Sequence, residues 1–120
     1  MSRWSHIAGV IRVDDWEETD KKRIRREGRR IIKFIQANAP VGSEGGLSFK
    51  LDINPNIYTV TRYVITVFGD LRGFGYKEDI ELFVAWWEEL MKSGLDIRNA
   101  IINLRTIDHA ITLDDSLVDK

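Results

Sequence analysis

Four stretches of the chain have the pattern of a β-strand: residues 47–53 alternate apolar and polar positions, residues 7–13 do so roughly, and the other two are short and rich in β-branched residues. They cover residues 7–13, 47–53, 61–68 and about 101–107, and they are rich in Val, Ile, Leu and aromatic side chains. Turn-forming residues flank the second stretch. Glycines precede it, and Asn54-Pro55-Asn56 separates it from the third stretch. The pattern predicts four short strands.

Another stretch repeats apolar residues at spacings of three and four, the period of an amphipathic helix. The helix is predicted to begin at Asp14, because Asp14 and Glu17 form a capping-box pattern, and to end before Pro40. Gly28 lies in its apolar stripe and is expected to approach the sheet closely, against Gly9. The stripe consists of Ile24, Gly28, Ile31, Ile35 and, at its end, Ala39.

A second helix is predicted over residues 77–93, with Gly94 as its C-terminal cap. The resulting order β-α-β-β-α-β predicts a ferredoxin-like α+β fold, in which both helices cover one face of a four-stranded antiparallel sheet in the order four-one-three-two. We expect one domain over residues 1–120, with residues 114–120 as a frayed tail. The apolar stripe of the second helix is Ile80, Phe83, Val84, Trp87, Leu90 and Met91.

Composition narrows the function classes. Among 120 residues, 18 basic and 19 acidic side chains give a net charge of −1, so the chain as a whole lacks the basic excess of a dedicated nucleic-acid binder. There is no cysteine, and with two histidines we expect no metal site. No apolar stretch has the length of a membrane span. The sequence predicts a cytoplasmic protein without a membrane partner.

Chain direction brings three unusual stretches, residues 4–6, 42–45 and 72–77, to one edge of the predicted sheet. Glycine-loop amides and the start of the second helix can hold an anion there, such as a phosphate or a nucleotide. The alternative is that the glycines only permit tight turns and the charged side chains are solvated. The ligand-binding candidates at this edge are Trp4, His6, Ser43, Glu44, Arg72, Tyr76 and Lys77.

Catalysis has little support in the sequence. No P-loop or dinucleotide fingerprint occurs, and no nucleophile–base–acid triad can be composed, so we expect no catalytic residues and no cofactor. His6 and Glu44 can be paired as acid and base within the edge, but a single histidine on a strand is more often a hydrogen-bonded structural residue.

The first helix is strongly basic and offers a second kind of site. Its cations can track the phosphates of a nucleic acid, with Arg25, Arg26, Arg29 and Arg30 as the central candidates. Acidic residues in the same predicted helix, from Asp14 to Glu27, favour instead a solvated face with internal salt bridges. Both interpretations stay open at this stage.

The sheet face without helices is predicted to be apolar, because alternation places on it Trp4, His6, Val10 and part of the set Val64, Thr66 and Phe68. Homodimerisation through this open face is therefore expected. Trp86 lies outside the apolar stripe of the second helix and is either further contact surface or a wedge between the two helices.

Residues 3–11, with the sequence Arg-Trp-Ser-His-Ile-Ala-Gly-Val-Ile, and the Gly-Ser-Glu-Gly loop at 42–45 resemble small uncharacterised bacteriophage proteins. The resemblance implies an accessory protein in the cytoplasm of an infected bacterium. In that setting the leading hypothesis is a non-enzymatic binder that antagonises a host process, for example an anti-phage defence. It would bind a host protein, or sequester a nucleotide signal at the edge where residues 4–6, 42–45 and 72–77 meet. The alternative is a nucleic-acid-binding domain that uses the basic helix.

Overall fold

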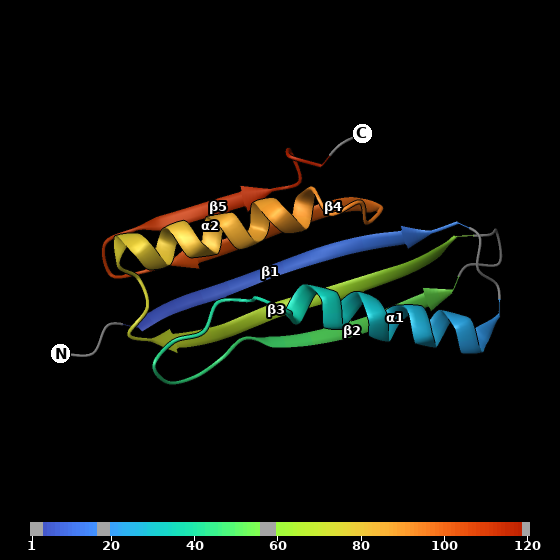
Figure 1. Ribbon diagram of the computed structural model, residues 1–120, viewed down its shortest axis with the longest axis horizontal. Coiled ribbons are helices and arrows are strands. Elements are labelled where there is room, and N and C mark those ends of the chain that lie inside the picture. The colour runs from blue at the N-terminus through green and yellow to red at the C-terminus, as the bar shows by residue number, and fades with distance from the viewer. Residues whose placement is uncertain (1–3, 17–19, 56–59, 119–120) are drawn as a thin grey trace.

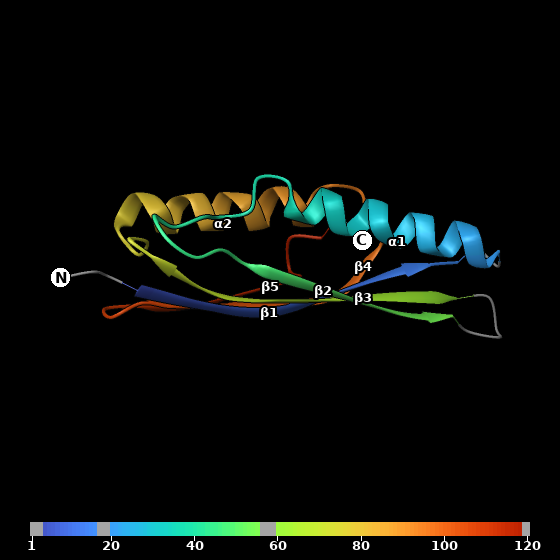
Figure 2. The ribbon, with the colours of Figure 1, turned by 90° about the horizontal axis from the view of Figure 1, so that it is seen from below.

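The computed structural model describes residues 4–16, 20–55 and 60–118, which form an α+β fold. All five strands join one antiparallel sheet in the order β2-β3-β1-β4-β5. Both helices lie on the same face of this sheet, α1 over the β2–β3 side and α2 over the β4–β5 side (Figures 1 and 2). In chain order the elements are β1 (Trp4–Asp15), α1 (Lys21–Gln36), β2 (Ser48–Pro55), β3 (Thr61–Arg72), α2 (Lys77–Met91), β4 (Ile97–Arg105) and β5 (Ala110–Asp114).

The sheet has one strand more than the four expected. The order four-one-three-two predicted for the first four strands is confirmed, and β5 adds to the free edge of β4 through pairs from Ile101–Asp114 to Arg105–Ala110. Asp114, the expected start of a frayed tail, is the last residue of β5, and its carbonyl oxygen accepts a hydrogen bond from Trp87 Nε1 at 2.8 Å. Five residues with two partly buried side chains are too short a pattern for the sequence to single out.

The first helix begins later than predicted, because β1 continues to Asp15. The Asp14 side chain is 2% exposed and caps nothing; its two oxygens accept hydrogen bonds from Arg12 at 2.9 and 3.0 Å, and Arg98 lies 3.5 Å away. Asp20 caps α1 instead, accepting from the backbone N–H of Lys22 at 2.8 Å. The predicted capping partner, Glu17, lies outside the described residues.

The core lies between the helices and one face of the sheet. The predicted α1 stripe of Ile24, Gly28, Ile31 and Ile35 is buried. The α2 stripe is confirmed at Phe83, Trp87, Leu90 and Met91, whereas Ile80 and Val84 are only partly buried. Trp86 is also buried, and its Nε1 donates to the carbonyl oxygen of Ile35 at 3.2 Å. It therefore packs between the two helices, which is one of the two interpretations that the sequence left open. No described helix is long and apolar enough to cross a membrane.

Two glycines mark close approaches in the core, but not against each other as predicted. A Cβ on Gly28 would meet side-chain atoms of Leu51, Ile53 and Tyr63, so α1 rests on β2 and β3 there. A Cβ on Gly9 would lie 2.6 Å from the backbone oxygen of Ile101, because β4 runs beside β1 at that point. The helix therefore approaches the sheet one and two strands away from β1, where the sequence had suggested the contact.

Candidate functional site

The three stretches predicted to converge at one edge of the sheet do meet there. The register of β1 and β3 places Trp4 opposite Arg72 and His6 opposite Asp70. The loop before β2 joins them through an isolated bridge between Glu44 and Arg72. We call this region, built from residues 4–6, 42–45 and 70–77, the converging edge.

Opposite charges at the converging edge pair with each other. The Arg72 guanidinium contacts the Glu44 carboxylate at 2.8 Å, and His6 Nδ1 forms a short contact with the Asp70 carboxylate. His6 and Asp70 remain well exposed, at 62% and 59% of their side-chain surfaces. The acid–base pair considered from the sequence, His6 with Glu44, is not formed, because each of the two residues has a different partner.

The glycines of this edge are required by backbone packing. A Cβ on Gly42 would collide with the carbonyl oxygen of Arg72, and one on Gly45, which has φ of +80°, would collide with that of Asp70. Ser43 donates its backbone N–H to the Arg72 carbonyl oxygen at 2.7 Å, and its hydroxyl donates to the same oxygen at 3.0 Å. The loop is therefore fastened to the end of β3.

The start of α2 is occupied by a carboxylate of the chain itself. Asp79 Oδ2 accepts hydrogen bonds from the backbone N–H groups of Gly75 and Tyr76, both at 3.1 Å. These two N–H groups are therefore already occupied and are not available to a bound anion at this helix start. The side chains of Tyr76 and Lys77 are exposed beside it.

Asp70 and Asp79 are the residues that sequence reasoning missed at this edge. Alternation along β3 puts Asp70 on the same face as Phe68, but its pairing with His6 depends on the register between β1 and β3, which the sequence does not fix. Asp79 stands three residues after Tyr76, and since tyrosine is not a usual N-cap residue the capping pattern was not visible.

The outer face of α1 is the second candidate site, and here the structure concentrates positive charge. The helix carries eight basic side chains and one acidic one over 16 residues. Six of the eight line a single surface depression of about 600 Å³ that no other residue type lines: Lys22, Arg25, Arg26, Arg29, Arg30 and Lys33.

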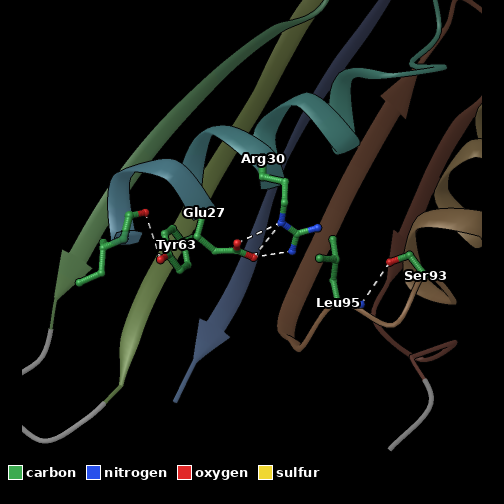
Figure 3. A network of polar contacts seen from close by, with 6 residues as sticks. Glu27, Arg30, Tyr63, Ser93 and Leu95 are labelled. Atoms are coloured by element: carbon green, nitrogen blue, oxygen red, sulfur yellow. Dashed lines mark hydrogen bonds and ion pairs between the residues drawn. The ribbon is translucent and has the colours of Figure 1, made fainter. Parts of the chain in front are cut away.

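One internal ion pair neutralises part of this face. Arg30 donates to both carboxylate oxygens of Glu27, through Nε at 3.1 and 3.0 Å and through a short Nη2 contact (Figure 3). These hydrogen bonds lower the pKa of Glu27 and raise that of Arg30. In the described part of the chain, no carboxylate pairs with the side chains of Lys22, Arg25, Arg26, Arg29 or Lys33.

The helix is held rigidly under this charge. The Tyr63 hydroxyl, reaching up from β3, donates to the carbonyl oxygen of Ile24 at 3.2 Å (Figure 3). Ile24, Ile31 and Ile35 are at most 5% exposed on the opposite side of the helix. The basic side chains therefore project from a fixed surface, in contrast to those of a disordered basic tail.

Charge is segregated between the two helices. α2 carries five acidic side chains and one basic, the reverse of α1. The molecule measures 52 × 27 × 18 Å, and the helices are displaced along its long axis (Figures 1 and 2). The acids of α2 consequently leave most of the α1 charge uncompensated at the other end of the molecule. Within the described ranges, no group of three or more His, Asp or Glu side chains that could hold a metal ion occurs.

No family model matches the chain, and no curated protein matches it. Among solved structures, an aminopeptidase, PepT, from Bacillus cereus matches 88% of the chain with 14% identity and a TM-score of 0.46. A phage SAM lyase in complex with S-methyl-5′-thioadenosine matches 90% with 12% identity and a TM-score of 0.42, and a Staphylococcus aureus tripeptidase matches 96% with 12% identity and a TM-score of 0.44. The chain spans 29% and 32% of the two peptidases and 88% of the lyase. Likenesses this distant assign no function.

Proposed function

We propose that this chain is a small non-enzymatic binding protein that holds nucleic acid by its phosphates on the outer face of α1. The observation that carries the proposal is the depression lined only by basic side chains, five of which have no carboxylate partner in the described residues. Like charges gathered on one rigid helix repel one another, and a polyanion relieves this repulsion while releasing its counterions.

The helix is long enough to lie along several phosphates. A helix of 16 residues is about 24 Å long, which corresponds to about seven base pairs of duplex. No aromatic side chain lines the depression, so the surface offers charge and hydrogen-bond donors to phosphates and no aromatic ring on which a base could stack. The expected binding is therefore strongly salt-dependent and tolerant of sequence.

The test is a fluorescence-anisotropy titration of a 20-base-pair duplex and a 20-nucleotide single strand across a salt series. If five phosphates are neutralised, the slope of log K against log salt on duplex is about −4.5, and affinity falls about 500-fold between 50 and 200 mM salt. Replacing Arg25, Arg26, Arg29 and Arg30 together by Gln should reduce the magnitude of that slope by about 3 to 4.

A charge-matched control separates this surface from bulk charge. The control replaces two exposed cations elsewhere, Lys77 and Lys92, by Gln and is compared with the double variant Arg25→Gln/Arg29→Gln, which has the same net charge and should reduce the magnitude of the slope by about 2. The control should keep the wild-type slope. Equal losses in the two variants, or no binding of either probe at 50 mM salt, would refute the proposal.

A second candidate function uses the converging edge, where a small nucleotide-like ligand or a host protein would be bound. The observation that favours it is that Trp4, His6 and Tyr76 have exposed side chains at the same end of the sheet, although the Arg72 and Glu44 charges already pair with each other. Adding mono- and dinucleotides to the same titration separates the candidates. A ligand that leaves the duplex affinity unchanged and loses its own binding in His6→Ala would locate the site at this edge.

The setting of either function remains a prediction from the sequence, namely an accessory protein of a bacteriophage that antagonises a host process. For the architecture, we interpret the first six elements as a ferredoxin-like core to which β5 is added. Such a core accommodates many functions, so it favours neither candidate.

A further inference from the structure

The sheet face opposite the helices is uncovered in the single chain (Figure 2). Its middle is apolar: Phe68 and Ile101 are 51% and 49% exposed, and Val10 between them is 36% exposed. The register makes this a continuous strip, because Ala8 lies beside Phe68, and Val10 lies beside Ile101. We call this surface the open face.

Charged side chains surround the apolar strip, and two of the rows across the sheet carry opposite charges at their two ends; Asp52 and Arg62 lie further along the same face. One row across the sheet reads Asp70, His6, Arg105, from β3 through β1 to β4. A second row crosses β1 at Val10, four residues after His6. This row begins with Lys50 on β2 and ends with Asp114 on β5. Each row thus has opposite charges at its two ends, with β1 near the middle.

We infer that the open face binds a second copy of this chain, the two sheets packing face to face about a two-fold axis parallel to β1. Such an axis places each row of one copy opposite the same row of the other copy, with its two ends reversed. Asp70 of one copy then faces Arg105 of the other, and Lys50 faces Asp114. Aligned sheets cross at about 30°, and lysine and arginine side chains are long enough to follow that angle.

The unpaired cations of this face support a second copy as its occupant. In the described part of the chain, no carboxylate pairs with the side chains of Lys50 or Arg105. A uniformly charged partner would leave one end of each row unmatched, whereas the chain itself supplies both signs in the reverse order.

The area is sufficient. The five strands together contain 46 residues, and each residue covers about 16 Å² of the face at about 4.8 Å between strands and about 3.3 Å along a strand. The product, about 700 Å² for each copy, approaches the roughly 800 Å² that each partner contributes to a standard stable interface. Because the helices lie on the other face, the dimer would present its two α1 surfaces on opposite sides.

Engineered cysteines test the axis directly, since the chain has no cysteine of its own. Ala8 lies on β1, at the axis, and packed sheets about 10 Å apart are bridged by a disulfide in immunoglobulin domains. Ala8→Cys should therefore form a covalent dimer under mild oxidation. Ser48→Cys is the matched control: it lies in the same row but two strands away, so its two copies would be about 19 Å apart and should stay unlinked.

Light scattering without ligand, combined with a charge-reversal cycle, provides the second test. Lys50→Glu places like charges opposite each other twice per dimer and should raise the dimer dissociation constant at least about tenfold. Adding Asp114→Lys to it should restore the constant to within about threefold. Lys77→Glu makes the same charge change at the start of α2, on the helix side of the sheet, and should have no effect.

The inference is overturned by a monomer at 100 µM wild-type protein, by linkage through Ser48→Cys but not through Ala8→Cys, or by a double variant no more dimeric than Lys50→Glu alone. Nucleic-acid binding enters none of these readouts, so failure here leaves the proposed function to its own test.

Discussion

Substituting alanine at two glycines should have opposite consequences, although both contact neighbouring elements closely. At Gly9 an added Cβ would lie 2.6 Å from the backbone oxygen of Ile101 and 2.6 and 2.8 Å from Cγ1 and Cβ of Ile102. At Gly28 it would lie 2.9 Å from Ile53 Cδ1, 3.0 Å from Leu51 Cδ2 and 3.3 Å from Tyr63 Cε1. The first set includes backbone of the neighbouring strand, and the second begins with the ends of two flexible side chains.

The magnitudes follow from what has to move. In Gly28→Ala the terminal methyl groups of Leu51 and Ile53 can rotate, and alanine in a helix interior gains about 0.5–1 kcal/mol over glycine. The two effects should cancel to within about 0.5 kcal/mol. In Gly9→Ala the methyl group forces β4 away from β1 at the centre of the sheet, and overpacking of this kind costs about 3 kcal/mol.

Urea unfolding followed by tryptophan fluorescence and circular dichroism measures both variants. The expected loss at Gly9→Ala is about 3 kcal/mol with an unchanged m-value, which corresponds to a melting temperature about 10 °C lower. If Gly9→Ala remained within 0.5 kcal/mol of wild type, or if Gly28→Ala were the more damaging change, the strand and helix packing described above would be refuted.

Two further substitutions test the charged groups. Arg12→Met should cost about 2–3 kcal/mol in urea unfolding, because the buried Asp14 carboxylate would then keep, among the described residues, only Arg98 at 3.5 Å as an ion-pair partner; a loss below 0.5 kcal/mol would show that Asp14 does not depend on Arg12. Glu27→Gln should cost about 0.5 kcal/mol at pH 7, since the pair is partly solvated. Because Arg30 lowers the folded-state pKa of Glu27, this contribution is present above the unfolded pKa of about 4.3 and should disappear as the pH falls through the folded pKa. The same variant frees Arg30 and should tighten duplex binding about threefold; weaker binding would contradict a phosphate-binding α1.

The periodic parts of the fold were predictable because burial alone decides them. The stripe from Ile24 to Ile35 and the alternation in β2 and β3 each put one face of an element in the core, and these faces were identified correctly. Right-handed connections then fixed the order of the first four strands and brought Trp4, Ser43 and Arg72 to one edge. Local pattern and topology were enough for this much.

Long-range pairing decided what was missed. Asp14 was predicted as a helix start on the basis of its neighbours in sequence, but Arg98, 84 positions later, and the Asp96 carbonyl oxygen keep it in the sheet. The partner of His6 depended in the same way on the register between β1 and β3. The strand β5 is held by β4 and by the Trp87 hydrogen bond more than by any periodicity of its own.

The misplaced helix start also changed the electrostatic interpretation. If Asp14 and Asp15 are counted in the first helix, acidic residues of that helix offset much of its positive charge. The net charge of −1 for the whole chain also argues against a nucleic-acid binder. In the structure both aspartates belong to β1, and Glu27 is the one acidic residue within α1. A phosphate backbone responds to charge within about a Debye length, about 8–10 Å, so the local excess on a 52 Å molecule matters more than the total. A chain that is nearly neutral overall can for that reason offer a polyanion a strongly basic face.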